Sequence, residues 1–171
     1  MSILPILEYP DPRLREKCVP ARTVDDRIRA ILNDMAETMY DAPGVGLAAA
    51  QVGVKERLVV IDVGSDDELD TSPRLYKLVN PEIIEEDGSI EYEEGCLSIP
   101  GVKDVVKRSG FVRVRALDEH GKPVEIEAEG LLAVCLQHEI DHLNGILFFD
   151  HLSRIKRARL LSRLEKLRKE A

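Results

Sequence analysis

The sequence contains no tryptophan, and only four tyrosines and three phenylalanines among its 171 residues. Proteins that bind single-stranded nucleic acids stack the bases on exposed aromatic side chains along a positively charged groove. This chain is poor in such side chains, and its formal net charge of -8 has the wrong sign for contact with phosphates. A nucleic-acid-binding module, including one that binds DNA directly, is therefore disfavoured.

Cysteine and long apolar runs are also scarce. Cys18, Cys96 and Cys135 are an odd number at irregular spacing, which argues against a disulfide framework and for a reducing compartment. No apolar run reaches the length that spans a bilayer, and the start, MSILPILEYPDPRLREKC, has no basic leader and is interrupted by prolines. We therefore expect a cytoplasmic protein without a signal peptide or a membrane segment.

The charge is distributed unevenly along the chain. Residues 153–171 carry eight Lys or Arg against two Glu, whereas the other 152 residues carry 16 basic against 30 acidic side chains. An acidic body with a basic tail suggests that the tail has an anionic partner of its own. The competing interpretation is a solvated amphipathic helix whose charges only maintain solubility.

The apolar pattern predicts an α+β fold. Residues 24–40 form an amphipathic helix whose apolar side chains share one face, with Thr23 or Asp25 as N-cap. Residues 131–143 are helical in character, and Asn144-Gly145 provides a C-terminal stop. Between these helices, five segments are rich in β-branched residues or alternate in polarity, and the last two are joined by a hairpin signal: 57–63, 75–84, 89–94, 111–117 and 123–129.

We predict one domain over residues 1–171, in which mostly antiparallel strands pack around the helix at 131–143. An N-terminal amphipathic helix and a basic C-terminal helix at 153–171 complete it. Residues 65–74 have the composition of a solvated loop. On the C-terminal helix, a narrow apolar seam is expected to dock on the body, formed by Ile155, Leu161, Leu164 and Leu167.

The stretch CLQHEIDHLNG holds two of the four histidines. His138 and His142 are four residues apart and therefore project from the same face of a helix, with Glu139 beside the first. In this H-E-x-x-H arrangement the imidazoles bind a metal ion and the glutamate takes a proton from water. A core helix with two hydrogen-bonded histidines is the competing interpretation.

A catalytic metal needs a third protein ligand. No glutamate or histidine lies at the downstream spacings that common metalloproteases use. Cys135 is three residues before His138, where ligation would strain the site, and Cys18 has no catalytic neighbours in sequence. Cys96 remains, in EEGCLSIPG, where the flanking glycines and proline allow close backbone approach. A turn with a buried thiol is the alternative.

Residues 44–53, GVGLAAAQVG, form a third unusual stretch. The spacing G-x-G-x-x-A matches a dinucleotide fingerprint, but that site needs a strand before it and a helix after it. Here a predicted helix and Pro43 come first. A glycine-rich backbone that ends in Gln51 is better suited to lie along an extended peptide and to offer an amide to an oxyanion.

In their order and separation, GVGLAAAQ, EGCLS and QHEIDHLNG resemble the three signature motifs of the peptide deformylases, and the opening YPDPRLR is also similar to that family. The resemblance implies removal of the formyl group from the formyl-methionine of nascent peptides. It implies metal ligation by Cys96, His138 and His142, with Glu139 as general acid/base. It also implies oxyanion stabilisation by Gln51 and the Leu97 N–H, and peptide binding at Gly46. The methionine side chain would need an apolar pocket, for which Val45, Leu131 and Cys135 are candidates.

The resemblance favours one Fe(II) ion as cofactor, although two imidazoles and a thiolate also suit Zn(II), Ni(II) or Co(II). A deformylase must meet its substrate as it leaves the polyanionic ribosome, so the positive charge of residues 153–171 suggests that the C-terminal helix binds the ribosome near the nascent-chain exit. Two alternatives stay open: another H-E-x-x-H metallopeptidase or amidase, and a noncatalytic ribosome-associated protein with a structural metal. The second needs a fourth ligand, and the sequence offers no evident one.

Overall fold

The structure is a computed structural model that describes residues 2–64, 69 and 74–170. The loop predicted for 65–74 therefore lies almost entirely outside the described residues. In the described part, three α-helices alternate with strands and short 3-10 helices. The α-helices are α1 (Asp26–Asp41), α2 (Gly130–Leu143) and α3 (Arg154–Glu170), and the 3-10 helices are η1 (Pro12–Arg15), η2 (Ala49–Val52) and η3 (Phe148–His151).

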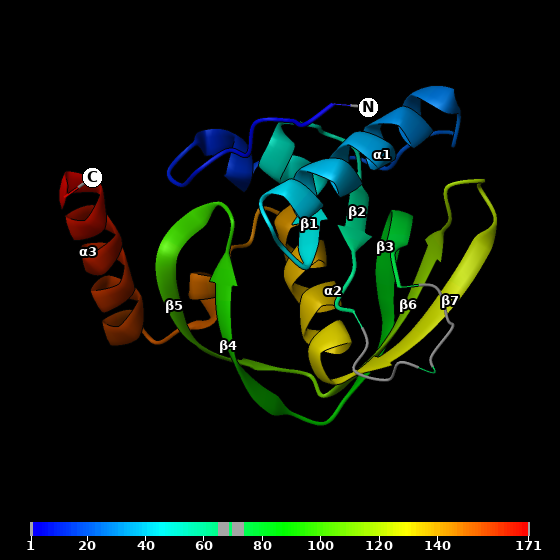
Figure 1. The fold of residues 1–171 in the computed structure, drawn as a ribbon. Helices are drawn as coiled ribbons and strands as arrows, with labels where there is room; N and C mark the ends of the chain where they lie inside the picture. The colour runs from blue at the N-terminus through cyan, green and yellow to red at the C-terminus, as the bar shows by residue number, and fades with distance from the viewer. Residues whose placement is uncertain (1, 65–68, 70–73, 171) are drawn as a thin grey trace.

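The strands form two separate antiparallel sheets, which confirms the predicted α+β class (Figure 1). The larger sheet has the order β1-β2-β3-β6-β7, and β4 pairs only with β5. The strands of the larger sheet are β1 (Gly46–Ala48), β2 (Leu58–Ile61), β3 (Tyr76–Asp87), β6 (Phe111–Leu117) and β7 (Pro123–Glu129), and the two-stranded sheet consists of β4 (Ile90–Cys96) and β5 (Ile99–Arg108).

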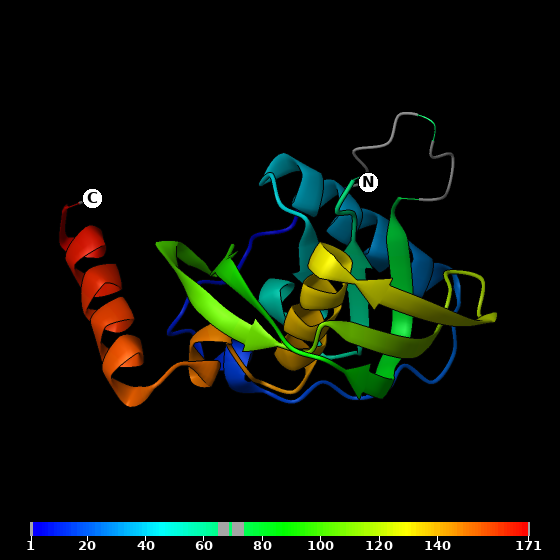
Figure 2. The same ribbon diagram turned by 90° about the horizontal axis from the view of Figure 1, so that it is seen from below.

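Helix α2 lies between the five-stranded sheet and the β4–β5 pair (Figures 1 and 2). It is buried along most of its length, as expected for a helix that is apolar on several sides. It ends at the predicted stop: Asn144 is the C-cap, and Gly145, at a φ of 75°, donates its N–H to the His142 carbonyl. A Cβ at Gly145 would lie 2.4 Å from the Arg15 carbonyl oxygen, so the glycine also permits close chain packing.

Helix α1 covers the five-stranded sheet with the face predicted from its periodicity. Ile28, Leu32, Met35 and Met39 are fully buried. The Asp25 side chain accepts the N–H of Ile28 (3.0 Å) and caps the helix, which confirms one of the two predicted caps. The helix begins at Asp26, two residues after the predicted start.

Helix α3 stands on the far side of the β4–β5 pair from the larger sheet (Figures 1 and 2). The predicted seam was partly wrong. Leu160 and Leu164 are buried against a second core that includes Ile99 and Phe148, whereas Ile155 is 66% exposed. Ile155 is five positions before Leu160, and because an α-helix turns once every 3.6 residues, Ile155 lies on nearly the opposite side of the helix. Leu167 remains 39% exposed in the last turns, although it reaches Gly101.

Two strands were not predicted. Strand β1 has only three residues, and β5 starts with Ile99-Pro100-Gly101, a sequence that reads as a turn. Strand β1 is held by pairing with β2, and β5 is held by pairing with β4 across a tight turn. No helix in the described residues is both long and apolar enough to cross a membrane.

Candidate metal centre and active-site cleft

Three potential ligand atoms converge at the centre of the molecule. His138 and His142 point from the same side of α2, and Cys96 ends β4 just before the turn into β5. The two Nε2 atoms are 3.2 Å apart, and the Cys96 Sγ lies 3.3 Å from the His142 Nε2. All three ligand atoms lie within 4.8 Å of one another. The structure thus brings the three predicted ligands together, while their role as ligands stays a prediction.

The spacing of these atoms fits a metal ion. Tetrahedral bonds of about 2.0–2.1 Å to nitrogen and about 2.3 Å to sulfur place ligands about 3.3 Å (N to N) and about 3.6 Å (S to N) apart. Burial alone would lower the pKa of His138, but the Glu139 charge and the hydrogen bonds to Cys96 and Glu94 raise that pKa well above its usual value. These protein groups therefore favour positive charge at His138, whereas burial and the charge of His138 hold the pKa of His142 well below its usual value.

Glu94 and Arg108 fix the orientation of His138 from behind. The Nδ1 of His138 lies 2.8 Å from a Glu94 carboxylate oxygen, and Arg108 donates to both oxygens of Glu94, at 2.8 and 2.9 Å. Burial would raise the pKa of Glu94, but the hydrogen bonds from Arg108 and His138 outweigh it and lower that pKa to about 2. Because the ionised Glu94 accepts a hydrogen bond from the Nδ1–H of His138, the other ring nitrogen, Nε2, is the one that faces the other ligand atoms and could bind a metal. Sequence reasoning had given neither residue a role.

Glu139 is buried beside the ligand atoms. Its Oε1 atom has no hydrogen-bond partner in the described part of the chain, and its Oε2 atom lies 2.5 Å from where a Cβ at Gly46 would be. Burial raises the pKa of Glu139 to about 7, partly opposed by the charge of His138. A buried carboxyl that titrates near neutrality can both take and release a proton during turnover.

Gln51 reaches the site from η2. Its Oε1 accepts the N–H of Ala48 (2.9 Å), which leaves the amide NH2 directed at the ligand loop. The Nε2 atom donates to the Ser98 Oγ at 3.1 Å and makes a long contact of 3.6 Å with the Cys96 Sγ. One N–H of Gln51 is therefore firmly engaged, and only the weakly bound one is available to a substrate oxygen.

A cleft of about 890 Å³ opens beside the ligand atoms. Nearly all of the predicted site residues line it: Val45, Gly46, Gln51, Cys96, Leu97, Leu131, Cys135, His138 and Glu139. His142 lies behind them and is not part of the lining. Cys135 is 6% exposed, lines the cleft and lies outside the ligand group, while its contact with a substrate side chain stays a prediction. Several lining residues were missed, because only the fold brings them to the cleft: Tyr92, Ile99, Lys103, Val134 and Arg163.

Strand β1 presents a backbone edge to this cleft. It is an end strand of the larger sheet and pairs only with β2. The Val45 carbonyl accepts the Asp62 N–H (2.9 Å), so by antiparallel alternation the N–H and C=O of Gly46 point away from β2. An extended peptide can therefore pair with Gly46 and place its first atoms near Glu139.

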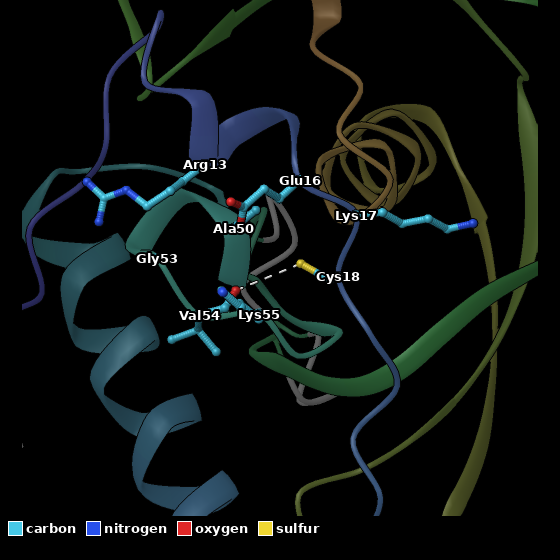
Figure 3. A pocket seen from close by; sticks show the side chains of 8 residues that line it. All are labelled: Arg13, Glu16, Lys17, Cys18, Ala50, Gly53, Val54 and Lys55. Atoms are coloured by element: carbon cyan, nitrogen blue, oxygen red, sulfur yellow. Dashed lines mark hydrogen bonds between the residues drawn. The ribbon is translucent and has the colours of Figure 1, made fainter.

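Cys18 lies apart from this centre, beside a small cavity of about 10 Å³ (Figure 3). This is room for one water molecule at most. Cys18 is 5% exposed, its Sγ contacts the Val54 carbonyl (3.8 Å), and burial raises its pKa. The cysteine is therefore a packing residue, as predicted.

Comparison with known proteins decides the family. Residues 3–158 match the sequence pattern of the family described as polypeptide deformylase. The chain belongs to the polypeptide deformylase family. Deformylases remove the N-terminal formyl group from nascent peptides. The peptide deformylase of Cellvibrio japonicus is 55% identical over 171 residues, which cover 99% of this chain and 98% of that protein.

Solved deformylase structures have the same fold. The crystal structure of a peptide deformylase from Legionella pneumophila superposes with a TM-score of 0.89 and 51% identity, covering 98% of this chain and 96% of that chain. A peptide deformylase from Ehrlichia chaffeensis in complex with actinonin superposes with a TM-score of 0.90 and 41% identity, covering 99% and 98%. The deformylase fold therefore extends over nearly the whole chain.

Proposed function

We propose that residues 1–171 act as one catalytic domain that hydrolyses the formyl amide of formyl-methionine peptides, with Glu139 as general acid/base. The observation that carries this proposal is the buried Glu139 carboxyl, which lies between three convergent ligand atoms and the free edge at Gly46. Cys96, His138 and His142 would hold one divalent metal ion. That ion would supply Lewis-acid chemistry, lowering the pKa of a water molecule and polarising the formyl oxygen.

Glu139 moves the proton in this scheme. Its carboxylate takes a proton from the attacking water as the new C–O bond forms at the formyl carbon. It then delivers the proton to the amine nitrogen as the C–N bond breaks, so that formate and a free amine leave. A pKa of about 7 suits both directions of transfer near neutral pH.

The surrounding backbone and side chains position the substrate. Gly46 pairs with the extended peptide, which places the formyl group beside Glu139. Gln51 and the Leu97 N–H donate hydrogen bonds to the developing oxyanion, and losing one such donor typically costs about 3–4 kcal/mol of barrier stabilisation. Val45, Leu131 and Cys135 offer apolar surface for the methionine side chain, because all of them line the cleft.

Two cysteine variants test the ligand set. Cys96→Ala removes the only anionic ligand and should lose metal affinity, whereas Cys135→Ala removes a wall residue and should change substrate preference more than metal content. Both proteins are purified anaerobically, and metal content is compared with turnover of a formyl-Met peptide. A full equivalent of tightly bound metal in the Cys96 variant would show that the third ligand is wrong.

The same samples identify the ion and the reaction class. Fe(II) is expected from the family resemblance, although Zn(II), Ni(II) and Co(II) also suit the donor set. A metallopeptidase would cleave internal bonds of unformylated peptides, whereas a deformylase requires the formyl group. Turnover of the formylated but not the unformylated peptide supports deformylation, and equal cleavage of both would contradict it.

The basic tail supports a second proposal, that α3 docks on the ribosome near the nascent-chain exit in the cytoplasm. All eight Lys and Arg side chains of this helix are exposed. Truncation would also remove the buried Leu160 and Leu164, so neutralising surface cations is the sharper test. The fourfold Gln variant at Arg154, Lys156, Arg159 and Lys166 should co-sediment less with ribosomes and keep its peptide turnover. Unchanged, salt-independent co-sedimentation would contradict the proposal.

A further inference from the structure

A chain of polar contacts, buried only at its inner end, continues outward from the metal centre. Arg108, whose side chain is 3% exposed, uses Nε and Nη2 for Glu94, as described above. Its third arm, Nη1, donates to the Asp141 Oδ2 at 2.7 Å. Asp141 lies on α2 next to His142, so Arg108 connects the start of the contact chain at β4 to a second point on the helix.

His151 closes the outer end of this chain. Its Nε2 lies 2.7 Å from the Asp141 Oδ2 and 3.2 Å from the Arg108 Nη1. A carboxylate only accepts hydrogen bonds, so the shorter distance requires a proton on the His151 Nε2. That nitrogen therefore donates to Asp141 and does not accept from Arg108. The hydrogen-bonded order is His151, Asp141, Arg108, Glu94, His138.

The inner end of this chain, at Arg108, is held by further hydrogen bonds, whereas the outer end, at Asp141 and His151, is more exposed to solvent. Gln137 bonds both the N–H (3.0 Å) and the carbonyl (2.9 Å) of Ser109, which fixes the backbone next to Arg108. The side chain of Asp141 is 21% exposed and that of His151 is 36% exposed. Without the hydrogen bond from His151, the Asp141 carboxylate could rotate to bind water and would then no longer accept the hydrogen bond from the Arg108 Nη1.

We propose that His151 is a positioning residue for the metal centre: by holding Asp141, it keeps Arg108 on Glu94 and thereby fixes the ring of His138. The inference rests on the proposed ligation of a metal by His138. His151 reaches the site only through three other residues and touches neither the ligand atoms nor the cleft. It lies in η3, outside the three motifs that carry the family resemblance.

The test uses the full-length protein with Co(II) as the probe, because its visible spectrum reports ligand geometry. His151→Leu removes the donor and retains apolar bulk, and His151→Gln restores an N–H donor. His120→Leu is the matched control, since the His120 side chain is 66% exposed in the β6–β7 turn. The measurements are the Co(II) dissociation constant by chelator competition, the Co(II) spectrum, kcat and KM for a formyl-Met peptide, and the unfolding temperature of the metal-free protein.

We expect His151→Leu to weaken Co(II) binding about 10-fold, the lower end of the range for partners behind a ligand. Its Co(II) spectrum should shift and kcat should fall. KM should stay within about twofold, because the residues that bind the substrate line the cleft, which His151 does not contact. His151→Gln should recover most of the affinity, and His120→Leu should match the parent. If His151→Leu does not fold, His151→Ala replaces it, because water can fill the exposed side of that position.

Three results would overturn the inference. The first is Co(II) affinity in the Leu variant within twofold of the parent, and the second is equal weakening in the Leu and Gln variants. The third is a loss of affinity that merely follows a lowered unfolding temperature of the metal-free protein, which would make His151 a folding residue only. Failure of the parent protein to bind Co(II) would refute the metal assignment itself, and the inference with it.

Discussion

At the scale of single residues, the closest approach in the site is between Gly46 and Glu139. A Cβ at Gly46 would lie 2.5 Å from the Glu139 Oε2 and 3.0 Å from its carboxyl carbon. The glycine therefore leaves the space that the Glu139 carboxyl occupies beside the peptide-binding edge. Its φ is not positive, so the requirement is one of space rather than of backbone conformation.

Gly46→Ala should consequently impair turnover more than folding. The carboxyl must move to admit a methyl group, and overpacking of this kind costs typically about 1–3 kcal/mol. We expect kcat for a formyl-Met peptide to fall at least about 10-fold, since misplacement of a catalytic group by about 1 Å can cost far more.

Gly44→Ala is the control for this prediction. Its Cβ would meet only the flexible end of the Leu97 side chain, at 2.8 Å, which can move aside. Equal loss of kcat in the two variants would show that the space beside Glu139 is not the cause.

The pKa of Glu139 predicts how the stability of the metal-free protein depends on pH. Burial raises this pKa from 4.5 to about 7, so the folded chain holds a proton that the unfolded chain releases between these values. The contribution of the protonated Glu139 to the free energy of unfolding is therefore fully present below about pH 4.5. It is lost as the pH rises towards about 7, which lowers the free energy of unfolding by at most about 3 kcal/mol. Glu139→Gln removes this loss.

Urea unfolding of the metal-free proteins at pH 5 and pH 8 tests the sign. The free energy of unfolding of Glu139→Gln relative to the parent should increase from the lower to the higher pH. Parallel behaviour of the two proteins would mean that the carboxyl is ionised throughout, and the pKa argument would fail.

The residues with recognisable chemistry could be predicted from the sequence. His138, His142 and Glu139 follow from helical spacing, and Cys96 followed by elimination among the cysteines. Glu94 and Arg108 could not, because 14 residues separate them along a hairpin and only the pairing of β4 with β5 brings them to His138. His151 had no local signal at all, since its partner Asp141 lies ten residues away across a turn.

At the scale of elements, periodicity predicted the helices and most of the larger sheet. It failed for β5, whose Pro100 and Gly101 suggest a turn, and for β1, which is too short to show alternation. It also misjudged α3, because several leucines and one isoleucine allow more than one apolar face. The correct face depends on where β5 and η3 lie, and that is tertiary information.

The corrected face of α3 gives a paired prediction. Leu164→Ala opens a cavity in the second core and should lower the free energy of unfolding by about 2–5 kcal/mol. Ile155→Ala, at a side chain that is 66% exposed, should change it by less than about 0.5 kcal/mol. Denaturant unfolding of both variants measures the difference. A larger loss of unfolding free energy in Ile155→Ala than in Leu164→Ala would show that the seam predicted from the sequence was right after all.

At the scale of the whole molecule, α2 is the element that joins the parts. It lies between the larger sheet and the β4–β5 pair (Figure 1). It carries His138, His142 and Glu139, whereas Cys96 and Glu94 come from β4. The cleft forms where β1, β4, β5 and α2 meet. Helical spacing places residues on one helix, but the meeting of two sheets across it depends on long-range packing that no local pattern encodes.

The division of labour at this centre is the central claim: three side chains hold a metal ion, and a fourth, Glu139, moves the proton. Glu139→Gln tests it directly, because the substitution keeps the shape and the three ligands and removes the base. We predict about one equivalent of bound metal with turnover of a formyl-Met peptide reduced by about 10²–10⁴-fold, the usual contribution of general acid–base catalysis. Turnover near that of the parent at full metal content, or inactivity that simply tracks loss of the metal, would contradict the account.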